Sequence, residues 1–549
     1  MTAQQTWQEK AAAYRAAALD KIPKEWRLPT SITNSVSETS DQCVLDIPRT
    51  CGLLTAEELD ITENYDAVAL AELLAKGKFT SVAVTTAFCK RAAIAQQLAN
   101  CLTETFFDIA LERAKFCDDY LNKQGKTLGH FHGLPISVKE TFSVKGVRTT
   151  IGFVSFATNP VKDFNSALIE ILLAQGAVLY VKTNVPQTMM TADSDNNLFG
   201  RVRNPHRLLL TAGGSSGGEG ALLAMKGSVI GVGTDIAGSV RIPAYVNGTI
   251  GFRPTARRVP YFGQTAAGRP GSWGILPSVG PLTRTVRDVE FFFSTVLGAQ
   301  NDIWSLDEAV VYAPWRKVSP SISETEGEKL CIGVLTESPK YPLHPSVFRT
   351  FNEAVSKLKA AGHTIVDMHK TLPADIIDSA SMTAWSNFNM DSTKHALSQC
   401  KVTGEPVIPS IPISSPPELK YFQPTIDDVF RVNVEMRAIG SLLKNAWVKE
   451  GLDVLVMPVY QGTAVGHDQY GVLGYTVLQN LVDYPTVSIP YGQANAELDA
   501  PFRRDVSYIP PYVPIEVEGA PSGFQIMGRT GRDEELVVST KIIEDAIRA

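Results

Sequence analysis

Cysteines are few in this sequence, and their spacing excludes two common kinds of site. Seven cysteines are spread over 549 residues, an odd number that includes no CxxC pair. This pattern provides neither the framework of a small disulfide-rich domain nor the ligand set of a zinc site. Free thiols are typical of a reducing compartment, and we therefore expect a cytoplasmic protein.

Long apolar runs and clustered positive charge are also missing. No run of roughly 18 apolar residues is present, and the first residues, MTAQQTWQEK, lack the apolar core of a secretion signal. The net charge is −6 at pH 7, whereas a protein surface that binds nucleic acid would carry clustered positive charge. We therefore expect no membrane span and no nucleic-acid partner.

The composition that is present indicates a globular protein with a large core. Apolar residues make up 44% of the chain and charged residues 20%. From Leu134 onward the pattern alternates, with a strand at Leu134–Val138, a helix at Ser166–Gln175 and a strand at Ala177–Lys182. Such alternation predicts an α/β sheet with helices on both faces. No linker is visible, and we expect an arm over residues 1–60 and one catalytic domain over 61–549.

Three segments outside this alternation carry weaker predictions. Trp7, Ala11, Tyr14 and Ala18 recur at helical spacing in the arm. This stripe suits either packing on the body or attachment to a membrane surface, and its alanine content favours packing. Residues 30–42 and 299–329 are polar and are predicted to form irregular chain. Residues 371–423 show the least periodicity, because prolines in SIPISSPPELK block regular structure.

The stretch from Thr211 to Arg241 holds two serines in glycine-rich settings. Ser215 and Ser239 flank a helical segment, Glu219–Lys226, and a buried strand, Val229–Val232. Each serine is therefore expected at a turn beside a regular element, where backbone amides can point at a ligand. Nucleophilic catalysis needs this combination of an exposed hydroxyl and donors for a developing oxyanion.

A serine also needs a base, and Lys139 is the nearby candidate. No histidine lies between His206 and His344, whereas Lys139 follows the apolar strand Leu134–Val138. Burial disfavours the charged ammonium, lowers the pKa and allows a lysine to act as a base near neutral pH. A lone lysine after an apolar run is more often solvated, and the order of all three residues favours the catalytic interpretation.

These segments resemble the amidase signature family. The resemblance rests on GGSSGG, TDIAGS and GLPISVKE, and on VKTNVPQT, VGPLTRTVRD, DVLVMP and GFQIMGR. It extends from about Leu54 to the C-terminus. FCKRAAIAQQL, VIGVGTDIAGS and GHDQY are similar to the fungal acetamidase-type general amidases. The resemblance implies a large mixed twisted sheet sandwiched by helices, with the N-terminal segment as a helical arm.

The resemblance also implies a hydrolytic mechanism without a metal or organic cofactor. Ser239 is expected as the nucleophile that becomes acylated, and Lys139 as the base. Ser215 is expected to relay protons between them from a cis Gly214–Ser215 peptide. The expected oxyanion hole consists of four backbone amides, those of Ile236, Ala237, Gly238 and Ser239.

Further residues receive supporting roles. Ser216 is expected to orient Lys139, while Asp235 and Arg241 are expected to form a structural ion pair. Met189 and Gly214 are expected near the substrate, although Met189 also suits ordinary core.

One departure from the family pattern, three aromatic residues and one loop bear on the substrate. Ala237 replaces a common glycine and could narrow the pocket. Trp385, Phe388 and Phe422 are candidates for lining its entrance, with plain core as the alternative, and the loop Arg253–Trp273 is a candidate for its mouth.

The expected substrates are small primary amides, and the chain could form a homo-oligomer. Three alternatives stay open at this point. A glutamine amidotransferase-like subunit would show copurifying subunits. A fatty-acid-amide-type hydrolase would need a membrane-binding apolar face, for which the sequence gives no strong sign. A non-catalytic binding protein is disfavoured because all three triad positions hold the required residues.

Overall fold

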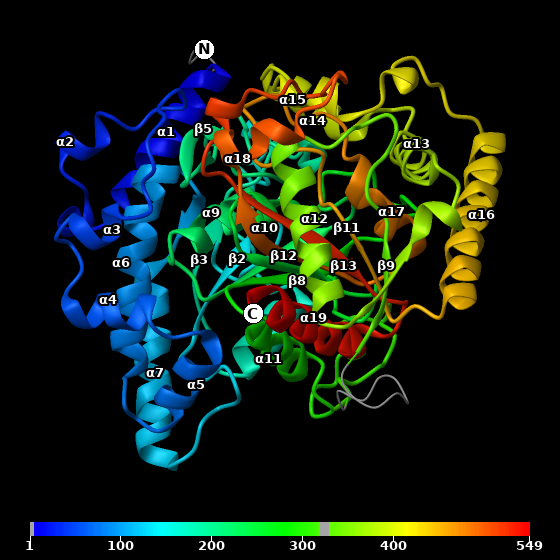
Figure 1. Ribbon diagram of the computed structural model, residues 1–549. Helices are drawn as coiled ribbons and strands as arrows, with labels where there is room; N and C mark the ends of the chain where they lie inside the picture. Colours follow the sequence, from blue (N-terminus) through cyan, green and yellow to red (C-terminus); the bar gives the residue numbers. More distant parts are fainter. Residues whose placement is uncertain (1–4, 319–328) are drawn as a thin grey trace.

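The protein is built around one sheet of 11 strands (Figure 1). The computed structural model describes residues 5–318 and 329–549. The strand order is β1-β3-β2-β6-β8-β7-β12-β13-β11-β9-β10. The strands are β1 (Leu102–Thr105), β2 (Pro135–Lys139), β3 (Val178–Thr183), β6 (Ile230–Asp235), β7 (Ile250–Arg253), β8 (Ser278–Thr283), β9 (Cys331–Val334), β10 (Thr364–Asp367), β11 (Val454–Met457), β12 (Thr486–Gln493) and β13 (Pro521–Met527). A separate hairpin pairs β4 (Arg203–Asn204) with β5 (Arg207–Thr211).

Helices surround this sheet. In the first half of the chain they are α1 (Trp7–Asp20), α2 (Thr30–Thr33), α3 (Ile47–Thr50), α4 (Ala56–Glu63), α5 (Ala67–Ala75), α6 (Ser81–Ala99), α7 (Phe107–Gln124), α8 (Ala167–Ala174), α9 (Gly217–Ala224), α10 (Arg241–Val246) and α11 (Val286–Val296). In the second half they are α12 (Pro345–Ala360), α13 (Ile376–Phe388), α14 (His395–Thr403), α15 (Ser410–Ser414), α16 (Ile426–Glu450), α17 (Gly474–Val482), α18 (Ala496–Asp499) and α19 (Asp533–Arg548).

Alternation along the strands directs side chains to helices on opposite faces. On β7, Gly251 lies against Ala244 of α10, whereas the next residue, Phe252, packs its ring against Phe293 of α11. The sheet is mixed, because β2 runs parallel to β3 and β6 while β8 runs antiparallel to β6 and β7. The predicted fold class, a mixed sheet sandwiched by helices, is confirmed.

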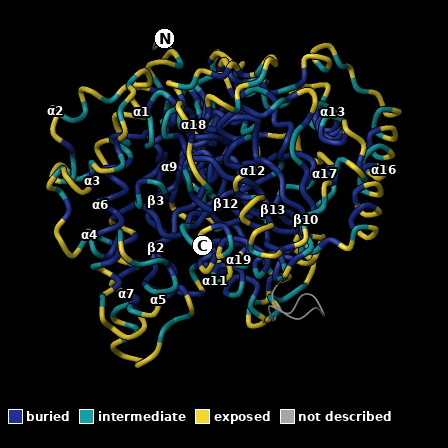
Figure 2. The backbone as a smooth tube through the Cα atoms, in the orientation of Figure 1, coloured by how far each residue is buried: buried dark blue, intermediate teal, exposed yellow. Residues whose placement is uncertain are grey.

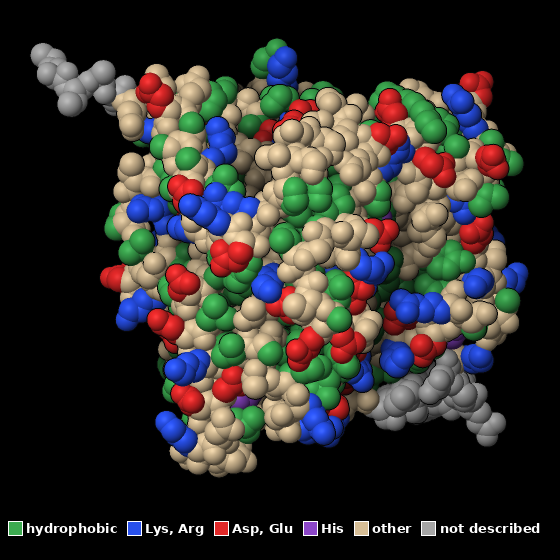
Figure 3. Space-filling model, turned by 90° about the vertical axis from the view of Figure 1, so that its left-hand side faces the viewer, with side chains coloured by type: hydrophobic (Ala, Val, Ile, Leu, Met, Phe, Trp, Pro, Cys, Tyr) green, Lys and Arg blue, Asp and Glu red, His purple; other side chains and the backbone are tan. Residues whose placement is uncertain are grey.

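The N-terminal arm packs on the body, as the favoured interpretation predicted. Ala11 of α1 is fully buried against Val154, Leu198 and Phe199. Residues 30–42 are less irregular than expected, because they include α2. On the side of the molecule formed by the arm and its neighbours, acidic and basic side chains are interspersed (Figure 3). None of the helices in the described ranges has the length and apolar character needed to cross a bilayer.

Residues 371–423, where the sequence shows the least periodicity, are more regular than that pattern indicates. This segment contains α13, α14 and α15. The buried residues of α13, which include Ile376, Ala380 and Trp385, do recur at helical spacing, but serines, threonines and asparagines between them weaken the pattern. Residues 299–318 are irregular as expected, and residues 319–328 lie outside the described residues.

Candidate active site

Lys139 ends β2 deep inside the protein. Its side chain is fully buried, and Nζ donates hydrogen bonds to Ser215 Oγ at 2.6 Å and to Thr234 Oγ1 at 2.9 Å. Ile136 and Val138, which alternate with it along the strand, are buried in the main core. The strand therefore points the lysine amine at the serine that the sequence singled out.

Burial changes the chemistry of this amine. Removal from water lowers the pKa of Lys139 to about 7, against the charges of Asp235 and Glu219, which act to raise it. A substantial share of the amine is therefore uncharged at neutral pH. An uncharged amine can accept a proton from a neighbouring hydroxyl.

Ser215 lies in the turn that leads into α9. The Gly214–Ser215 peptide is cis, as the family resemblance implied. Gly214 packs tightly, since a Cβ placed there would lie 2.6 Å from the carbonyl oxygen of Thr191. Gly214 therefore has a clear packing role in the turn that presents Ser215, while its expected contact with substrate stays a prediction.

Ser239 lies in the loop between β6 and α10, beside the turn that carries Ser215. The Ser216 amide donates to the Ser239 carbonyl oxygen at 3.1 Å, which holds the two serine segments together. The Ser239 side chain forms no hydrogen bond with Ser215 within the described part of the chain. Ser239 is 5% exposed and Ser215 only 2%. The structure thus joins Lys139 to Ser215 directly and Ser239 to them through the backbone.

The expected oxyanion hole needs one correction. The Gly238 amide donates to Asp235 Oδ1 at 2.8 Å, and so it is already engaged. Within this loop, the backbone amides of Ile236, Ala237 and Ser239 donate a hydrogen bond to none of the described residues. Gly238 itself has φ +114°, and a Cβ there would lie 2.4 Å from Thr476 Oγ1. This glycine shapes the loop, and three amides remain as candidate donors.

Asp235 and Arg241 form the buried ion pair that the sequence predicted. Arg241 Nε lies 3.0 Å from Asp235 Oδ2, and both side chains are inaccessible to solvent. Burial alone would raise the pKa of Asp235, but Arg241 and Asn480 hold it well below its usual range. The ionised carboxylate also accepts from the Val240 amide at 3.2 Å. The pair therefore fixes the loop that carries Ser239.

Two polar neighbours of Lys139 differ from expectation. The Ser216 hydroxyl is buried but has no hydrogen-bond partner in the described residues, so it does not orient Lys139 here. Its side chain instead lies against β6, where a Cβ on Gly233 would be 2.7 Å away. Thr234 takes that place, and sequence reasoning missed it. A threonine in a buried strand carries no distinctive signal, because only the pairing of β2 with β6 brings it to the lysine.

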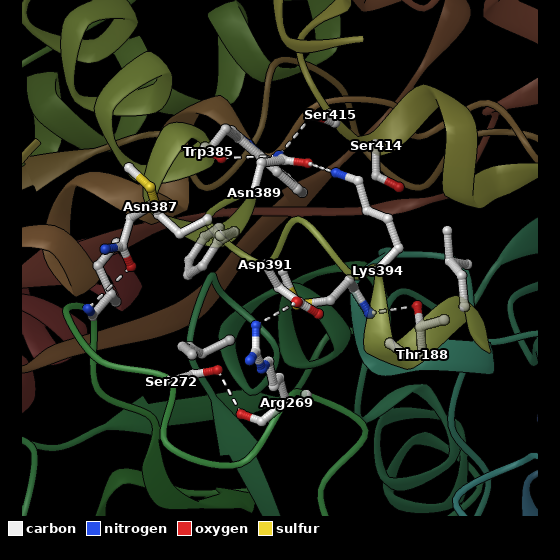
Figure 4. Close-up of a pocket in the computed structure, with 18 of the residues that line it drawn as sticks. Thr188, Arg269, Ser272, Trp385, Asn387, Asn389, Asp391, Lys394, Ser414 and Ser415 are labelled. Carbon is white, nitrogen blue, oxygen red and sulfur yellow. Dashed lines mark hydrogen bonds and ion pairs between the residues drawn. The ribbon is translucent and has the colours of Figure 1, made fainter. Parts of the chain in front are cut away.

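A cavity of about 510 Å³ reaches this loop at Ile236 (Figure 4). Trp385 and Phe388 line it as expected, whereas Phe422 does not. Thr188 and Met190 also line it. Met189, between them, packs against a separate apolar cluster and does not line the cavity, and its expected contact with substrate stays a prediction. Part of the loop Arg253–Trp273 forms the wall, namely residues 268–273.

Polar and charged side chains also line the cavity. Figure 4 shows Lys394 directed at Asn389, with Nζ 3.3 Å from Asn389 Oδ1, and Arg269 paired with Asp391 at 3.4 Å. Lys139, Ser215 and Ser239 do not line the cavity themselves, and Ile236 is its link to them. No group of three or more His, Cys, Asp or Glu in residues 5–318 and 329–549 is placed to hold a metal ion.

Comparison with known proteins gives consistent similarities over the whole length. The sequence model of the family described as Amidase matches residues 83–537. A protein named Amidase from Gibberella moniliformis is 40% identical and is covered completely, as is this chain. An Acetamidase from Emericella nidulans is 36% identical over 96% of both chains.

Solved structures share the fold. One titled fatty acid amide hydrolase has a TM-score of 0.89 and 31% identity, covering 99% of this chain and 95% of that one. A structure of 6-aminohexanoate cyclic dimer hydrolase has a TM-score of 0.70 and 22% identity, covering 89% of this chain and 98% of that one. At that identity the second likeness shows the fold alone.

Proposed function

Because this chain belongs to the amidase family and is a hydrolase of amides, we propose that it cleaves small carboxylic amides to a carboxylate and ammonia. The proposed triad is Lys139, Ser215 and Ser239. The observation that carries this proposal is the fully buried Lys139 amine, 2.6 Å from the Ser215 hydroxyl and with its pKa lowered to about 7.

In the proposed mechanism, protons move along the triad while an acyl-enzyme forms. Neutral Lys139 takes a proton from Ser215, which takes one from Ser239 as the Ser239 oxygen attacks the amide carbon. The candidate amides of Ile236, Ala237 and Ser239 stabilise the oxyanion. The relay returns a proton to the leaving nitrogen, and ammonia departs. Water activated by the same relay then releases the carboxylate.

The proposed substrate class rests on the loop and on the relatives. Two relatives are named acetamidase, at 36% and 34% identity. Ala237 is 3% exposed and places a methyl group beside the candidate oxyanion amides. This methyl group favours a compact acyl group, aliphatic or aryl, over a bulky one.

One observation favours a second candidate, the hydrolysis of fatty-acid amides. The cavity has an apolar section lined by Ile236, Trp385 and Phe388, and its volume of about 510 Å³ exceeds what an acetyl group needs. The structure titled fatty acid amide hydrolase is also 31% identical. A long acyl chain would fill more of this cavity than a short one.

A panel of acetamide, hexanamide, benzamide and oleamide separates the two candidates. Each methylene that is buried in a fitting pocket contributes ~0.8 kcal/mol. We expect kcat/KM to level off or fall beyond a few carbons. A rise that continues to oleamide would replace the small-amide proposal with the lipid one, and no ammonia release from any of them would reject both.

A further inference from the structure

Glu219 is a fully buried carboxyl group that the mechanism above does not use. It lies in the first turn of α9, four residues after Ser215, and its side chain is inaccessible to solvent. Oε2 lies 2.6 Å from Ser137 Oγ, and Oε1 accepts from Thr183 Oγ1 at 2.9 Å. Ser137 precedes Lys139 by two positions on β2, so both side chains point to the same face of the sheet.

The hydrogen bonds around Ser137 indicate whether the Glu219 carboxyl group carries a proton. Ser137 Oγ lies 2.8 Å from Ser228 Oγ and 2.6 Å from Glu219 Oε2. The Ser228 hydroxyl donates to the carbonyl oxygen of Ile230 at 2.8 Å, which uses its only hydrogen. The geometry makes Ser137 the donor toward both neighbours, but its single hydrogen serves only one of them, and the 2.8 Å contact with Ser228 needs it. A contact of 2.6 Å between Ser137 and Glu219 therefore needs its hydrogen from the carboxyl group.

We propose that Glu219 is a positioning residue held as a neutral carboxylic acid, which donates from Oε2 to Ser137 and adds no negative charge to that of Asp235 near Lys139. This proposal rests on the proposed role of Lys139 as the base. The acid ties α9 to β2 and β3, the elements around the lysine. An ionised Glu219 would stabilise the ammonium of Lys139 and so weaken it as a base.

The groups that face Glu219 are consistent with a neutral acid. Burial raises the pKa of Glu219 to about 8, although Ser137, Thr183 and Lys139 act to lower it. The other titratable groups that interact with it are Tyr180 on β3 and Cys101 ahead of β1, and burial raises the pKa of each. Beyond Lys139, these surroundings supply no cation that would hold Glu219 ionised.

Infrared spectroscopy of the full-length enzyme tests where the proton lies. At pH 6.5 the wild type should show the carbonyl stretch of a buried carboxylic acid, and Glu219→Gln should lose that band. Ser228→Ala should shift the midpoint of the band to lower pH, because the freed Ser137 hydroxyl can then donate to the carboxylate. A wild type without the band would overturn the proposal, as would a midpoint that does not move in Ser228→Ala. If Glu219→Gln does not fold, the midpoint of the band in Ser228→Ala still tests the proposal.

The pH profile tests the link to Lys139. Because glutamine is neutral like the proposed acid, Glu219→Gln should keep turnover and leave the acid limb of kcat/KM in place. Glu219→Ala, which leaves Thr183 without its carboxyl partner and Ser137 with Ser228 alone, should lose more turnover than the glutamine variant. If Glu219 is ionised in the wild type, glutamine should instead move the acid limb about one pH unit lower. Failure of the proposed role of Lys139 would be seen in a different variant: if Lys139 is not the base, Lys139→Ala should retain turnover.

Discussion

At the scale of single residues, the protonation of Lys139 sets the expected pH dependence. The amine can act as a base only when neutral, and its pKa of about 7 means that it is protonated at lower pH. We therefore expect kcat/KM to rise with pH through about 7 and then to level off. Measurement of kcat/KM from pH 5 to pH 9, with chemistry rate-limiting, checks this. A flat profile would contradict the assigned role.

Substitution of Lys139 gives a second prediction. Lys139→Ala should reduce kcat/KM by about 10²- to 10⁴-fold, the usual contribution of a general base. Lys139→Arg should fail as well, because a guanidinium group keeps its proton at any pH the enzyme tolerates. Circular dichroism spectra show whether each variant is folded. An arginine variant with near-normal turnover would exclude the lysine as the base.

The two serines can be told apart by covalent labelling. Ser239→Ala should abolish both amide hydrolysis and labelling by a serine-directed phosphonate, because it removes the proposed nucleophile. Ser215→Ala should slow labelling but leave the label on Ser239. Peptide mass mapping locates the label, and a label on Ser215 in the wild type would reverse the assignment.

Sequence alone could predict the residues that have a distinctive setting, and it missed those that depend on contacts. Lys139 and Asp235 were identifiable because each occurs within a characteristic string. Thr234 was not, since its role follows from the pairing of β2 with β6. The engagement of the Gly238 amide by Asp235 likewise depends on the path of the loop, which its letters do not specify.

At the scale of elements, the loop between β6 and α10 depends on the ion pair of Asp235 and Arg241. Arg241→Met would leave the buried Asp235 carboxylate without its cation, and breaking such a pair costs about 3–5 kcal/mol. We expect the free energy of unfolding, measured in urea, to fall by that amount. Arg287→Met is the matched control, because its pair with Asp66 is half exposed and is worth at most about 1 kcal/mol. Equal losses in the two variants would contradict the argument.

Element boundaries were predictable where a buried stripe stands out from its surroundings. β2 and β3 lie within one residue of the expected strands, Leu134–Val138 and Ala177–Lys182, and every residue of both strands is buried. α13 was missed, because small polar residues such as Ser381 and Thr383 are buried on it and carry no apolar signal. Their burial follows from the packing of α13 on α16 and α17, a contact between distant parts of the chain.

At the scale of the whole molecule, the sheet order assembles the proposed site. β2 and β6 are neighbours in the sheet, and this places Lys139 against Thr234, which is 95 positions later in the chain. The alternating pattern predicts that a sheet exists, but it does not predict which strands are adjacent. The family resemblance implied that Lys139, Ser215 and Ser239 come together, through motifs that match in the same order, but the adjacency of β2 and β6 comes from the structure.

The N-terminal arm gives the last prediction, which concerns whether residues 1–60 form part of the main fold (Figure 2). Ile22, Leu28 and Val44 of the arm are buried in the same core cluster as the strands of the sheet. The side chain of Lys21 also pairs with Glu104 on β1 at 2.5 Å. Deletion of residues 1–60 would expose this apolar surface, and each large side chain uncovered costs about 1.5–3 kcal/mol.

We therefore expect the deleted protein to unfold at a clearly lower temperature and to lose turnover along with its fold. Asp20→Asn serves as the control, because it removes only the charge pair of the exposed Asp20 with Arg27 and should shift Tm little. Differential scanning calorimetry of the full chain, the deletion and the control gives the comparison. A deletion that keeps the Tm and the kcat/KM of the full chain would show that the arm is a separate unit, whose removal leaves the catalytic domain intact.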